Sequence, residues 1–600
     1  MRPAPADTAI PHVELTREMV LAWHLRDDLR AGRSLDDPRT RLDLALWWIS
    51  SARLEFPAQA GERTPGDVAL AGEVLLPGTG PRDAAVTRLM DFMRRLRPGD
   101  AAGYDLATAR GRRALAAWYY ACAVPELHLF DLLGAREREW LLAPVTPPLP
   151  PAGLPLPRLA RLLWENRADV RDAFDLESPD GPAALLAWYF AHGVAEMRHQ
   201  AYAAWLAPRG PEETPPAPPE PGRRLPAAPP PRHAFGANII GYARGELGIG
   251  EDSRMCALSL AQADTPFAVV NIPVGSCTRE ADGYLDACLA EDAPYPVNIF
   301  CLTGLDTARV WLERGNALFA GRVNIGYWPW ELPAWPEGMA DAYTLMDELW
   351  VSSAYTRDAF AKSAPIPVRL APMAVAVDRI TPRPRAYFGL PDDRFLFLYT
   401  FDCNSYLARK NPLAAIAAFR EAFAASDAPV ALVLKTMNVR EDDPRWLALA
   451  EAASGDRRIL FLRETMDRGD VLGLFAACDA YLSPHRAEGF GRTLAEAMLL
   501  GKPVIATNHS GSADFLTPET GFPVAYRLSP VGAGEYPFGE GLTWADPDID
   551  ALARAMRLVT RAPELAARRA AAGRERIGSR HHPRTVGLAY RERLRGLCSR

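Results

Sequence analysis

Several features that mark membrane, secreted or nucleic-acid-binding proteins are missing from this sequence. It contains no apolar run of about eighteen residues, so we expect no transmembrane helix. The first residues carry no apolar stretch of the kind found in a signal peptide. A net charge of −6 argues against a general nucleic-acid binder, because such proteins are usually basic.

Paired cysteines are also missing. The eight cysteines stand singly and form no Cys-x-x-Cys pair, so the sequence indicates neither a zinc site nor a disulfide framework. This pattern fits a reducing compartment, and we therefore expect a cytoplasmic protein. Peripheral contact with the inner face of a membrane stays open at this point.

What the chain does have is length and an abrupt change in composition. Its 600 residues are too many for one hydrophobic core. Residues 208–233 are dense in proline, which blocks helices and strands and favours a stiff, extended spacer. We therefore expect a linker at 208–233 that separates a domain at 1–207 from the rest of the chain.

The first 207 residues contain an internal repeat. Leu46–Glu55, Ala117–Glu126 and Ala187–Glu196 each open on an aromatic cluster and close on a glutamate, and these glutamates are 71 and 70 residues apart. We predict an all-α domain of three repeats of about 70 residues, which bury their faces against one another. The aromatic residues are interpreted as core, and the alternative is a surface for an acceptor, a partner protein or a membrane.

After the linker, short apolar runs alternate with helical stretches. In the first block these runs are 238–241, 267–271, 297–301, 323–326 and 349–351, and in the second block they are 395–399, 431–434, 458–462, 480–482 and 504–506. This alternation predicts parallel sheets covered by helices on both faces. We expect two Rossmann-like domains that face a cleft, at 234–380 and 381–600.

The richest stretch is Glu488-Gly-Phe-Gly-Arg-Thr-Leu-Ala-Glu496. It lies between two strand-like runs and contains a glycine turn followed by a helix-forming segment. The loop would therefore stand at the carboxyl end of a parallel strand, where open sheets bind ligands. Unpaired amides and the helix N-terminus can hold a phosphate there, and a carboxylate one turn into the helix can hold sugar hydroxyls.

These residues resemble the E-x7-E motif of retaining glycosyltransferases of family 4, which have the GT-B fold. The resemblance implies that Glu488 contacts the donor sugar and that Glu496 contacts the ribose of the nucleotide. It also implies that the amides of Gly489, Phe490 and Gly491 approach the sugar and the diphosphate. The alternative is an ordinary surface helix with two solvated acids.

A basic pair, Arg409 and Lys410, follows the first strand of the second domain. In related enzymes a basic pair at this place clamps the donor diphosphate and stabilises it as it leaves. The family commonly has an arginine directly after the strand, whereas this chain has Asp402 there. Lys435, at the end of the next strand, is a further candidate, and a pair of exposed bases at a helix start is the alternative.

Three other segments are assigned through the resemblance. The glycine-rich turn after the first strand places Gly248 and Gly250 beside the donor phosphates, unless they only shape a tight turn. Ser510 and Gly511 would contribute amides near the nucleotide. Trp330 and Glu331 are candidates for the acceptor side, with packing as the alternative for the tryptophan.

The string Asp546-Pro-Asp548 matches a metal signature of a different glycosyltransferase fold. It precedes a helix, where aspartate is a common N-cap, so we interpret it as capping and predict no metal site.

Taken together, the resemblance implies a retaining, metal-independent hexosyltransferase that uses a nucleotide-sugar donor and no cofactor. The acceptor would be a glycan, a lipid-linked sugar or a protein, in bacterial surface polysaccharide or glycoconjugate synthesis. Nucleic acid is not an expected partner. The alternatives are a non-catalytic sugar- or nucleotide-binding scaffold on a degenerate GT-B fold and another GT-B enzyme, such as a nucleotide-sugar epimerase.

Overall fold

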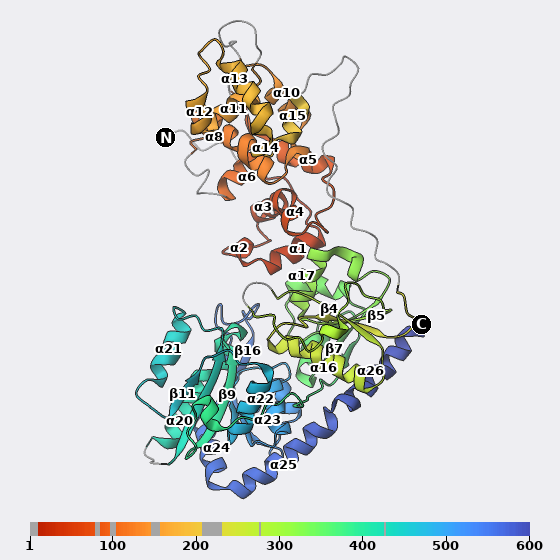
Figure 1. Cartoon of the computed structure of the whole chain (residues 1–600), viewed down its shortest axis with the longest axis vertical. Helices are drawn as coiled ribbons and strands as arrows, with labels where there is room; N and C mark the ends of the chain where they lie inside the picture. Colours follow the sequence, from red (N-terminus) through yellow and green to blue (C-terminus); the bar gives the residue numbers. More distant parts are fainter. Residues whose placement is uncertain are drawn as a thin grey trace. The chain divides into compact units, whose positions relative to one another are not determined.

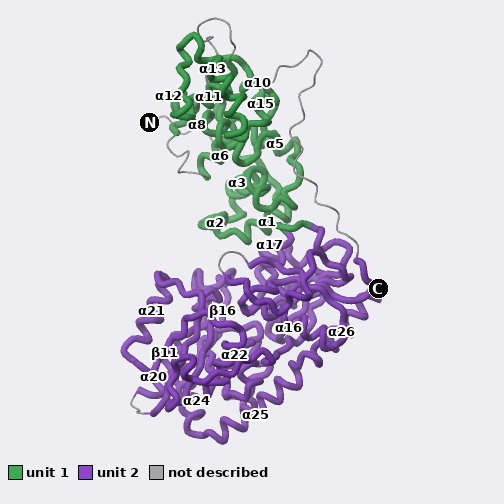
Figure 2. The backbone as a smooth tube through the Cα atoms, viewed as in Figure 1, with its two compact units in different colours: residues 1–226, 312–315 green, residues 227–311, 316–600 purple. Residues whose placement is uncertain are grey.

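The computed structural model describes residues 10–78, 84–96, 104–145, 156–206, 231–274, 278–424 and 428–599. The chain divides into two compact units, coloured separately in Figure 2. Unit 1 comprises residues 1–226 with 312–315, and unit 2 comprises 227–311 with 316–600. Among the described residues, no helix is long and apolar enough to cross a membrane. Of the predicted linker 208–233, residues 208–230 lie outside the described residues.

Unit 1 is built from short helices (Figure 1). The described α-helices are α1 (Arg17–Leu25), α2 (Asp27–Arg30), α3 (Pro38–Trp47), α4 (Arg53–Glu55), α5 (Pro65–Gly72), α6 (Arg88–Leu96), α8 (Ala109–Trp118), α9 (Val124–Glu126), α10 (Ala135–Leu142), α11 (Arg158–Asn166), α12 (Ala168–Ala173), α13 (Gly181–Trp188), α14 (Val194–Glu196) and α15 (Gln200–Leu206). The predicted helical character is confirmed. The structure adds one small antiparallel pair, β1 (Val74–Leu76) with β2 (Val86–Thr87).

The three aromatic segments of unit 1 fold alike. In each, an α-helix ends at a tryptophan, a five-residue π-helix follows, and a three-residue α-helix ends at the glutamate. The π-helices are η1 (Trp48–Ala52), η2 (Tyr119–Ala123) and η4 (Tyr189–Gly193). Because π-helices are rare, their occurrence at the same place in all three segments supports one repeated structural unit.

The glutamates of the first and third segments form the same kind of ion pair. Glu55 pairs with Arg26, and Glu196 pairs with Arg167 at 2.6 Å. Each arginine stands three residues after the tryptophan of its preceding helix, so the two pairs occupy matching positions. Trp47, Trp118 and Tyr189 are buried, which supports the interpretation of the aromatic residues as core.

Unit 2 contains two parallel six-stranded sheets. The first has the strand order β4-β3-β5-β6-β7-β8. Its strands are β3 (Ala237–Gly241), β4 (Phe267–Asn271), β5 (Val297–Cys301), β6 (Val323–Tyr327), β7 (Glu348–Val351) and β8 (Val368–Leu370), and its helices are α16 (Gly248–Gln262), α17 (Gly304–Arg314) and α18 (Ala354–Ala361).

Buried asparagines fix the register of this first sheet. Asn238, Asn298 and Asn324 stand opposite one another on β3, β5 and β6. The amide of Asn238 donates to Asn298 at 2.9 Å, and that of Asn298 donates to Asn324 at 2.8 Å. A slip of one residue would leave these buried amides unsatisfied, so the ladder favours one pairing.

The second sheet has the strand order β11-β10-β9-β12-β13-β14. Its strands are β9 (Phe395–Asp402), β10 (Val430–Met437), β11 (Ile459–Leu462), β12 (Ala480–Ser483), β13 (Val504–Thr507) and β14 (Phe522–Val524). The helices of this domain are α19 (Leu407–Lys410), α20 (Pro412–Phe423), α21 (Pro444–Ala453), α22 (Arg468–Ala477), α23 (Arg492–Leu499) and α24 (Ile549–Arg561). The strand order reverses direction between β9 and β12, and such a switch point is where open α/β sheets bind ligands.

The end of the chain ties the two sheet domains together. A hairpin of β15 (Tyr526–Pro530) and β16 (Thr543–Pro547) precedes α24, and Asp548 caps that helix as predicted. α25 (Pro563–Arg580) and α26 (Pro583–Cys598) follow. Arg591 of α26 donates to Ala263 O at the end of α16, so the last helix returns to the first domain. The predicted fold class is confirmed: two Rossmann-like domains preceded by a helical region.

Candidate functional site

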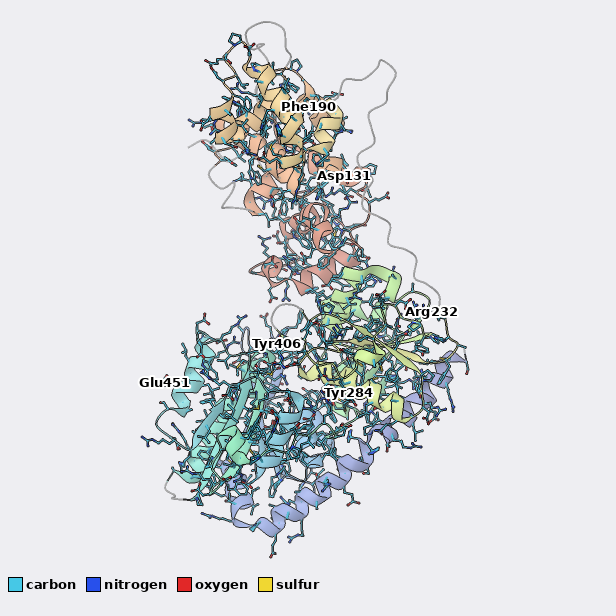
Figure 3. All side chains as sticks on the ribbon, in the orientation of Figure 1. Asp131, Phe190, Arg232, Tyr284, Tyr406 and Glu451 are labelled. Carbon is cyan, nitrogen blue, oxygen red and sulfur yellow. The ribbon has the colours of Figure 1, made fainter. Side chains whose placement is uncertain are left out.

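A cavity of about 380 Å³ lies between the two Rossmann-like domains of unit 2. The first domain contributes the turn before α16 and the segment around Tyr284, which Figure 3 labels. The second domain contributes the carboxyl ends of β9 and β10, the start of α22 and the first turns of α23. The cavity therefore opens at the strand ends where the sequence places the motif.

The motif loop is held by a neighbouring turn. Gly491 has φ +92°, a left-handed conformation that favours glycine and lets the chain turn into α23. Ser510 accepts from the amide of Glu488 at 2.8 Å, and the amide of Gly511 donates to Glu488 O at 2.8 Å. A Cβ on Gly511 would lie 2.1 Å from Gly489 O, so only glycine permits this approach.

Two cations of the second domain hold the first motif glutamate. Lys410 donates to Glu488, and Arg409 Nη1 lies 3.4 Å from its other oxygen. Burial alone would raise the pKa of Glu488, but the two cations outweigh it and lower the pKa to about 2. Glu488 is therefore a fixed anion at neutral pH.

The predicted basic pair separates into two environments. Lys410 lines the cavity, whereas Arg409 is buried behind it. Arg409 Nη1 donates to Ala487 O at 3.0 Å and lies 3.8 Å from Glu331 of the first domain. The two residues therefore differ: Lys410 faces the ligand space, and Arg409 supports Glu488 from the protein side.

The second motif glutamate is also held by an arginine. Glu496 is 1% exposed, lines the cavity and is bound by both terminal nitrogens of Arg468. Arg468 Nε lies 3.7 Å from Glu251 of α16, so this arginine joins the two domains. Because Arg468 neutralises Glu496, the carboxylate can accept hydroxyl groups without carrying an unbalanced buried charge.

Lys435 is a buried cation without a carboxylate partner. The residue is 5% exposed and lines the cavity, and its ammonium donates to Thr436 O at 3.0 Å. No carboxylate of a described residue lies within ion-pair distance of it. Burial lowers the pKa of Lys435, with opposition from Asp402. An anion in the cavity would stabilise the charged form of this side chain.

The other predicted residues differ in whether they line the cavity. Gly248 lines the cavity, whereas Gly250 packs against the chain, where a Cβ would lie 2.4 Å from Gly245 O. Gly489, Phe490 and Gly491 are buried and are not among the cavity-lining residues.

The acceptor-side candidates are tied to the hairpin of the second domain. Trp330 is 3% exposed, and its indole donates to Ala334 O at 2.8 Å. Its ring lies 5.7 Å from that of Tyr536, whose hydroxyl donates to Glu331. The packing alternative therefore describes Trp330, while Glu331 is held by Tyr536 and faces Arg409.

Four charged residues of the site did not emerge from the sequence. Arg468, Arg492 and Glu251 line the cavity, and Asp252 pairs with Arg492. One signal was available: Arg468 and Arg492 each begin a helix at the carboxyl edge of the second sheet. Nothing in the sequence pairs them with acids more than two hundred residues earlier, because that contact depends on how the two domains meet.

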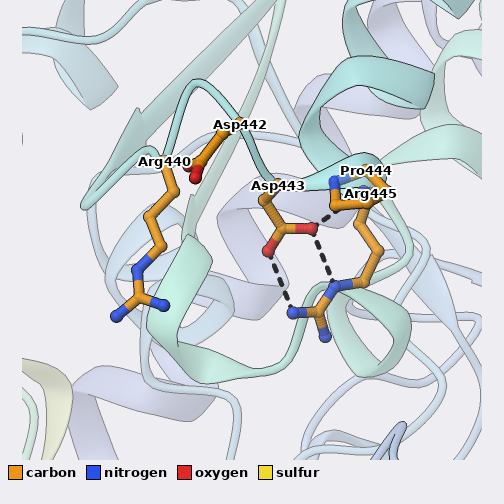
Figure 4. A pocket seen from close by; sticks show the side chains of 5 residues that line it. All are labelled: Arg440, Asp442, Asp443, Pro444 and Arg445. Atoms are coloured by element: carbon orange, nitrogen blue, oxygen red, sulfur yellow. Dashed lines mark hydrogen bonds and ion pairs between the residues drawn. The ribbon is translucent and has the colours of Figure 1, made fainter.

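A second hollow lies in the loop before α21 (Figure 4). Arg440, Asp442, Asp443, Pro444 and Arg445 line it. Asp443 caps α21 by accepting from the amide of Arg445 at 2.8 Å and also holds its guanidinium. These contacts explain Asp443 and Arg445 as parts of a capped helix start.

Comparisons with known proteins agree with this picture. Residues 391–576 match the family described as glycosyl transferases group 1. No curated protein is significantly similar to the chain in sequence. Similar solved structures include sucrose-phosphate synthase from Thermosynechococcus elongatus, with 18% identity, 61% of this chain and 99% of that chain covered, and a TM-score of 0.46. HepE from Anabaena in complex with UDP and glucose has 15% identity, covers 60% of this chain and 100% of its own, and has a TM-score of 0.44.

The glycosyltransferase from Rickettsia africae has 13% identity, 61% of this chain and 99% of that chain covered, and a TM-score of 0.46. The sequence match covers most of the second Rossmann-like domain, including the motif loop and both of its glutamates. The two parallel six-stranded sheets with their intervening cavity and the returning final helix give the architecture. The chain has the GT-B fold, and its residues 391–576 match glycosyl transferases group 1.

Proposed function

We propose that this protein is a glycosyltransferase that moves a sugar from a nucleotide-sugar donor to a hydroxyl acceptor. One observation carries the proposal: Glu496 lines the cavity, and each motif glutamate is held by a cation that lines it too. Lys410 holds Glu488, and Arg468 holds Glu496. A site for a nucleotide sugar needs both cations and carboxylates, because the diphosphate requires cations and the hydroxyl groups require fixed hydrogen-bond acceptors.

Each residue has a role in this proposal. Glu496 accepts the ribose hydroxyls, and Glu488 contacts the donor sugar. Lys410 and Lys435 neutralise the diphosphate, whose negative charge grows as the bond to the sugar breaks. Arg409 keeps Glu488 ionised and in place.

We propose retention of the anomeric configuration by attack on the face from which the diphosphate leaves. The bond from the sugar anomeric carbon to the phosphate oxygen breaks, and a bond from that carbon to the acceptor oxygen forms. The acceptor proton passes to the departing diphosphate. Glu488 is unsuited to form a covalent intermediate, because Lys410 and Arg409 already hold it. Among the described residues, His, Cys, Asp and Glu side chains form no group of three that could bind a metal, and the proposed reaction uses none.

The proposed acceptor lies on the first Rossmann-like domain and is a glycan, a lipid-linked sugar or a protein, in bacterial surface polysaccharide or glycoconjugate synthesis. We propose that the protein is cytoplasmic, because its donor would come from a cytoplasmic supply of nucleotide sugars. Unit 1 is the proposed surface for a protein partner or for peripheral contact with the inner membrane face.

The test incubates the full chain with UDP-, GDP- and ADP-sugars, with and without candidate glycan acceptors, and measures release of the nucleoside diphosphate. A transferase releases it slowly alone and faster with its acceptor, and NMR of the product reports the anomeric configuration. Activity that survives EDTA supports the metal-independent mechanism. Binding without release would favour the scaffold alternative, and interconversion of the sugar without transfer would favour an epimerase.

A further inference from the structure

Arg492 occupies a distinctive place in the cavity. It is the first residue of α23, directly after Gly491, and its side chain is 12% exposed. Arg492 and Glu496 are four residues apart, so their side chains lie on the same face of the helix, and both line the cavity. Arg492 is about one helical turn, roughly 5.4 Å, closer to the helix N-terminus.

This arginine reaches across to the other Rossmann-like domain. Its guanidinium donates to Asp252 near the start of α16 and to Ala374 O, at 3.4 Å, in the segment that joins the domains. Asp252 is buried, and burial raises its pKa to about 6 even though Arg492 opposes the shift. With this pKa Asp252 is mostly ionised at neutral pH beside Arg492, but it can take up a proton if Arg492 leaves it.

The other cations of the cavity are differently placed. Arg468 is committed to Glu496 by two contacts, and Lys410 is committed to Glu488. Lys435 lies on β10 and has no carboxylate partner among the residues that the structure describes. At the motif helix itself, Arg492 is thus the cation whose present partner is most easily replaced by a stronger anion.

We propose that Arg492 is a ligand for the donor diphosphate, and that Asp252 holds it in place while the cavity is empty. This inference rests on the proposed function, because it needs a nucleoside diphosphate whose ribose lies at Glu496. The ribose then stands one turn into α23, and the diphosphate extends toward the helix N-terminus, where Arg492 and the free amides lie. Nucleotide binding exchanges an ion pair between domains for a forked contact with phosphate oxygens.

The exchange predicts opposite effects for its two partners. Arg492→Gln removes the phosphate contact and weakens binding. Asp252→Asn removes the competing carboxylate, so Arg492 is available to the phosphates and binding strengthens. A merely structural ion pair predicts instead that both variants weaken the junction between domains and shift ligand affinity in the same direction.

The experiment titrates UDP, GDP and ADP into the full chain by calorimetry and continues with the tightest binder and its nucleoside. For Arg492→Gln we expect diphosphate affinity to fall at least about tenfold and nucleoside affinity to stay unchanged. For Asp252→Asn we expect a gain of a few-fold that disappears when Arg492→Gln is added. Arg383→Gln is the control, because it removes an arginine paired with Asp470 outside the cavity and should leave both affinities unchanged.

Three results would overturn the assignment. One is weaker diphosphate binding in Asp252→Asn, another is an equal loss of diphosphate and nucleoside affinity in Arg492→Gln, and the third is unchanged diphosphate affinity in a folded Arg492→Gln variant. Failure of the unmodified chain to bind any of the three diphosphates would instead overturn the proposed function, on which the assignment depends. Thermal unfolding of each variant separates a misfolded protein from a folded one with altered binding.

Discussion

The two Rossmann-like domains bring different charge patterns to the cavity that they share. Arginines of the first domain that line it are paired with acids of that domain: Arg254 with Glu251, Arg279 with Glu246 and Arg379 with Asp282. Cations of the second domain hold the motif glutamates or reach across to the first domain, and Lys435 has no carboxylate partner within the described part of the chain. The first domain is therefore nearly balanced by itself, whereas the second retains cations suited to an anionic ligand.

This difference supports the proposal that a donor diphosphate binds the second domain. A phosphate competes poorly for an arginine that already has a buried acid beside it, because the displaced acid would be left unpaired. It competes better for Lys435, and for Arg492, because Asp252 with a pKa of about 6 can take up a proton when it is displaced. Closing the cavity around a diphosphate would then exchange contacts between domains for contacts with the ligand.

The difference between the two domains is tested most directly by removing Lys410, the member of the basic pair that lines the cavity. For Lys410→Ala we expect turnover to fall roughly 100- to 1,000-fold, because the lysine stabilises the leaving diphosphate. The affinity for the bare nucleoside should change little. Steady-state release of nucleoside diphosphate measures the first quantity and calorimetry the second.

Lys362→Ala is the matched control for Lys410→Ala. Lys362 is exposed on the first domain, where it donates to Pro333 O, so its removal should leave turnover unchanged. Near-normal turnover in a folded Lys410→Ala variant would mean that Lys435, and not Lys410, stabilises the leaving diphosphate.

The next largest effect is expected at the second motif glutamate. Glu496→Ala should weaken donor binding by about 1–3 kcal/mol, since it removes acceptors of charge-assisted hydrogen bonds from the ribose. Calorimetry with the nucleoside diphosphate measures this loss. Because Arg468 loses its partner too, thermal unfolding must be recorded alongside.

Glu441→Ala is the control for Glu496→Ala, because Glu441 is an exposed carboxylate that pairs with Arg463 and does not line the cavity. Unchanged nucleotide affinity in folded Glu496→Ala protein would contradict the ribose role.

The inner strands of both sheets and the edge strands β4 and β11 were predicted from the sequence, whereas the edge strands β8 and β14 were not. Buried strands such as β5 and β10 are continuous apolar runs, which the sequence makes plain. The edge strand β8 is largely exposed, and β14 contains Pro523, so neither has that signature. The hairpin of β15 and β16 was missed because β15 is mostly exposed and has no buried face to pattern it.

The candidate site also has one part that the sequence predicts and one part that it does not. The motif fixes Glu488, Glu496 and the turn between them, because their spacing is local to one loop and one helix. Arg468 and Arg492 also contact Glu251 and Asp252 of α16, and these contacts exist only once the domains have met. Local chemistry is visible in a sequence, whereas charge pairing between domains is a property of the assembled fold.

A pH series tests whether the charges across the cavity stabilise unit 2. Opposing burial, nearby cations lower the pKa values of Glu251 and Glu488 to about 2, from an ordinary value of 4.5. Each lowered pKa contributes stability above pH 4.5 that is lost as the pH falls toward 2. Asp252 acts in the opposite sense, because its raised pKa of about 6 adds stability as the pH falls from 6 toward 3.8.

We therefore expect the unfolding free energy of unit 2 to fall between pH 4.5 and 2, with a smaller opposing term above that range. Hydrogen–deuterium exchange of residues 480–507, in the second sheet, reports this locally. Glu251→Gln should reduce the slope. Equal protection at the two ends of this range would show that these ion pairs add nothing to stability.

The smallest effect is expected from removing unit 1. A shortened chain that begins at residue 231 should fold and retain donor hydrolysis close to the level of the full chain. The physical reason is that one continuous hydrophobic cluster runs from Ala237 to Leu597 through both sheets of unit 2. Leu163 and Tyr189 of unit 1 belong to a separate, smaller cluster. Starting at residue 231 keeps Arg232, which pairs with Asp292.

The shortened chain separates two physical pictures of the molecule. If the repeats only hold a partner or an acceptor, donor hydrolysis persists and transfer to a large acceptor falls. If unit 2 instead needs apolar cover from unit 1, the shortened chain exposes an apolar surface and aggregates. Adding residues 1–206 as a separate chain distinguishes that case from simple misfolding, because rescue of solubility would show one integrated structure. Soluble protein with unchanged donor turnover places all of the donor chemistry in the two Rossmann-like domains, where their unequal charge patterns meet.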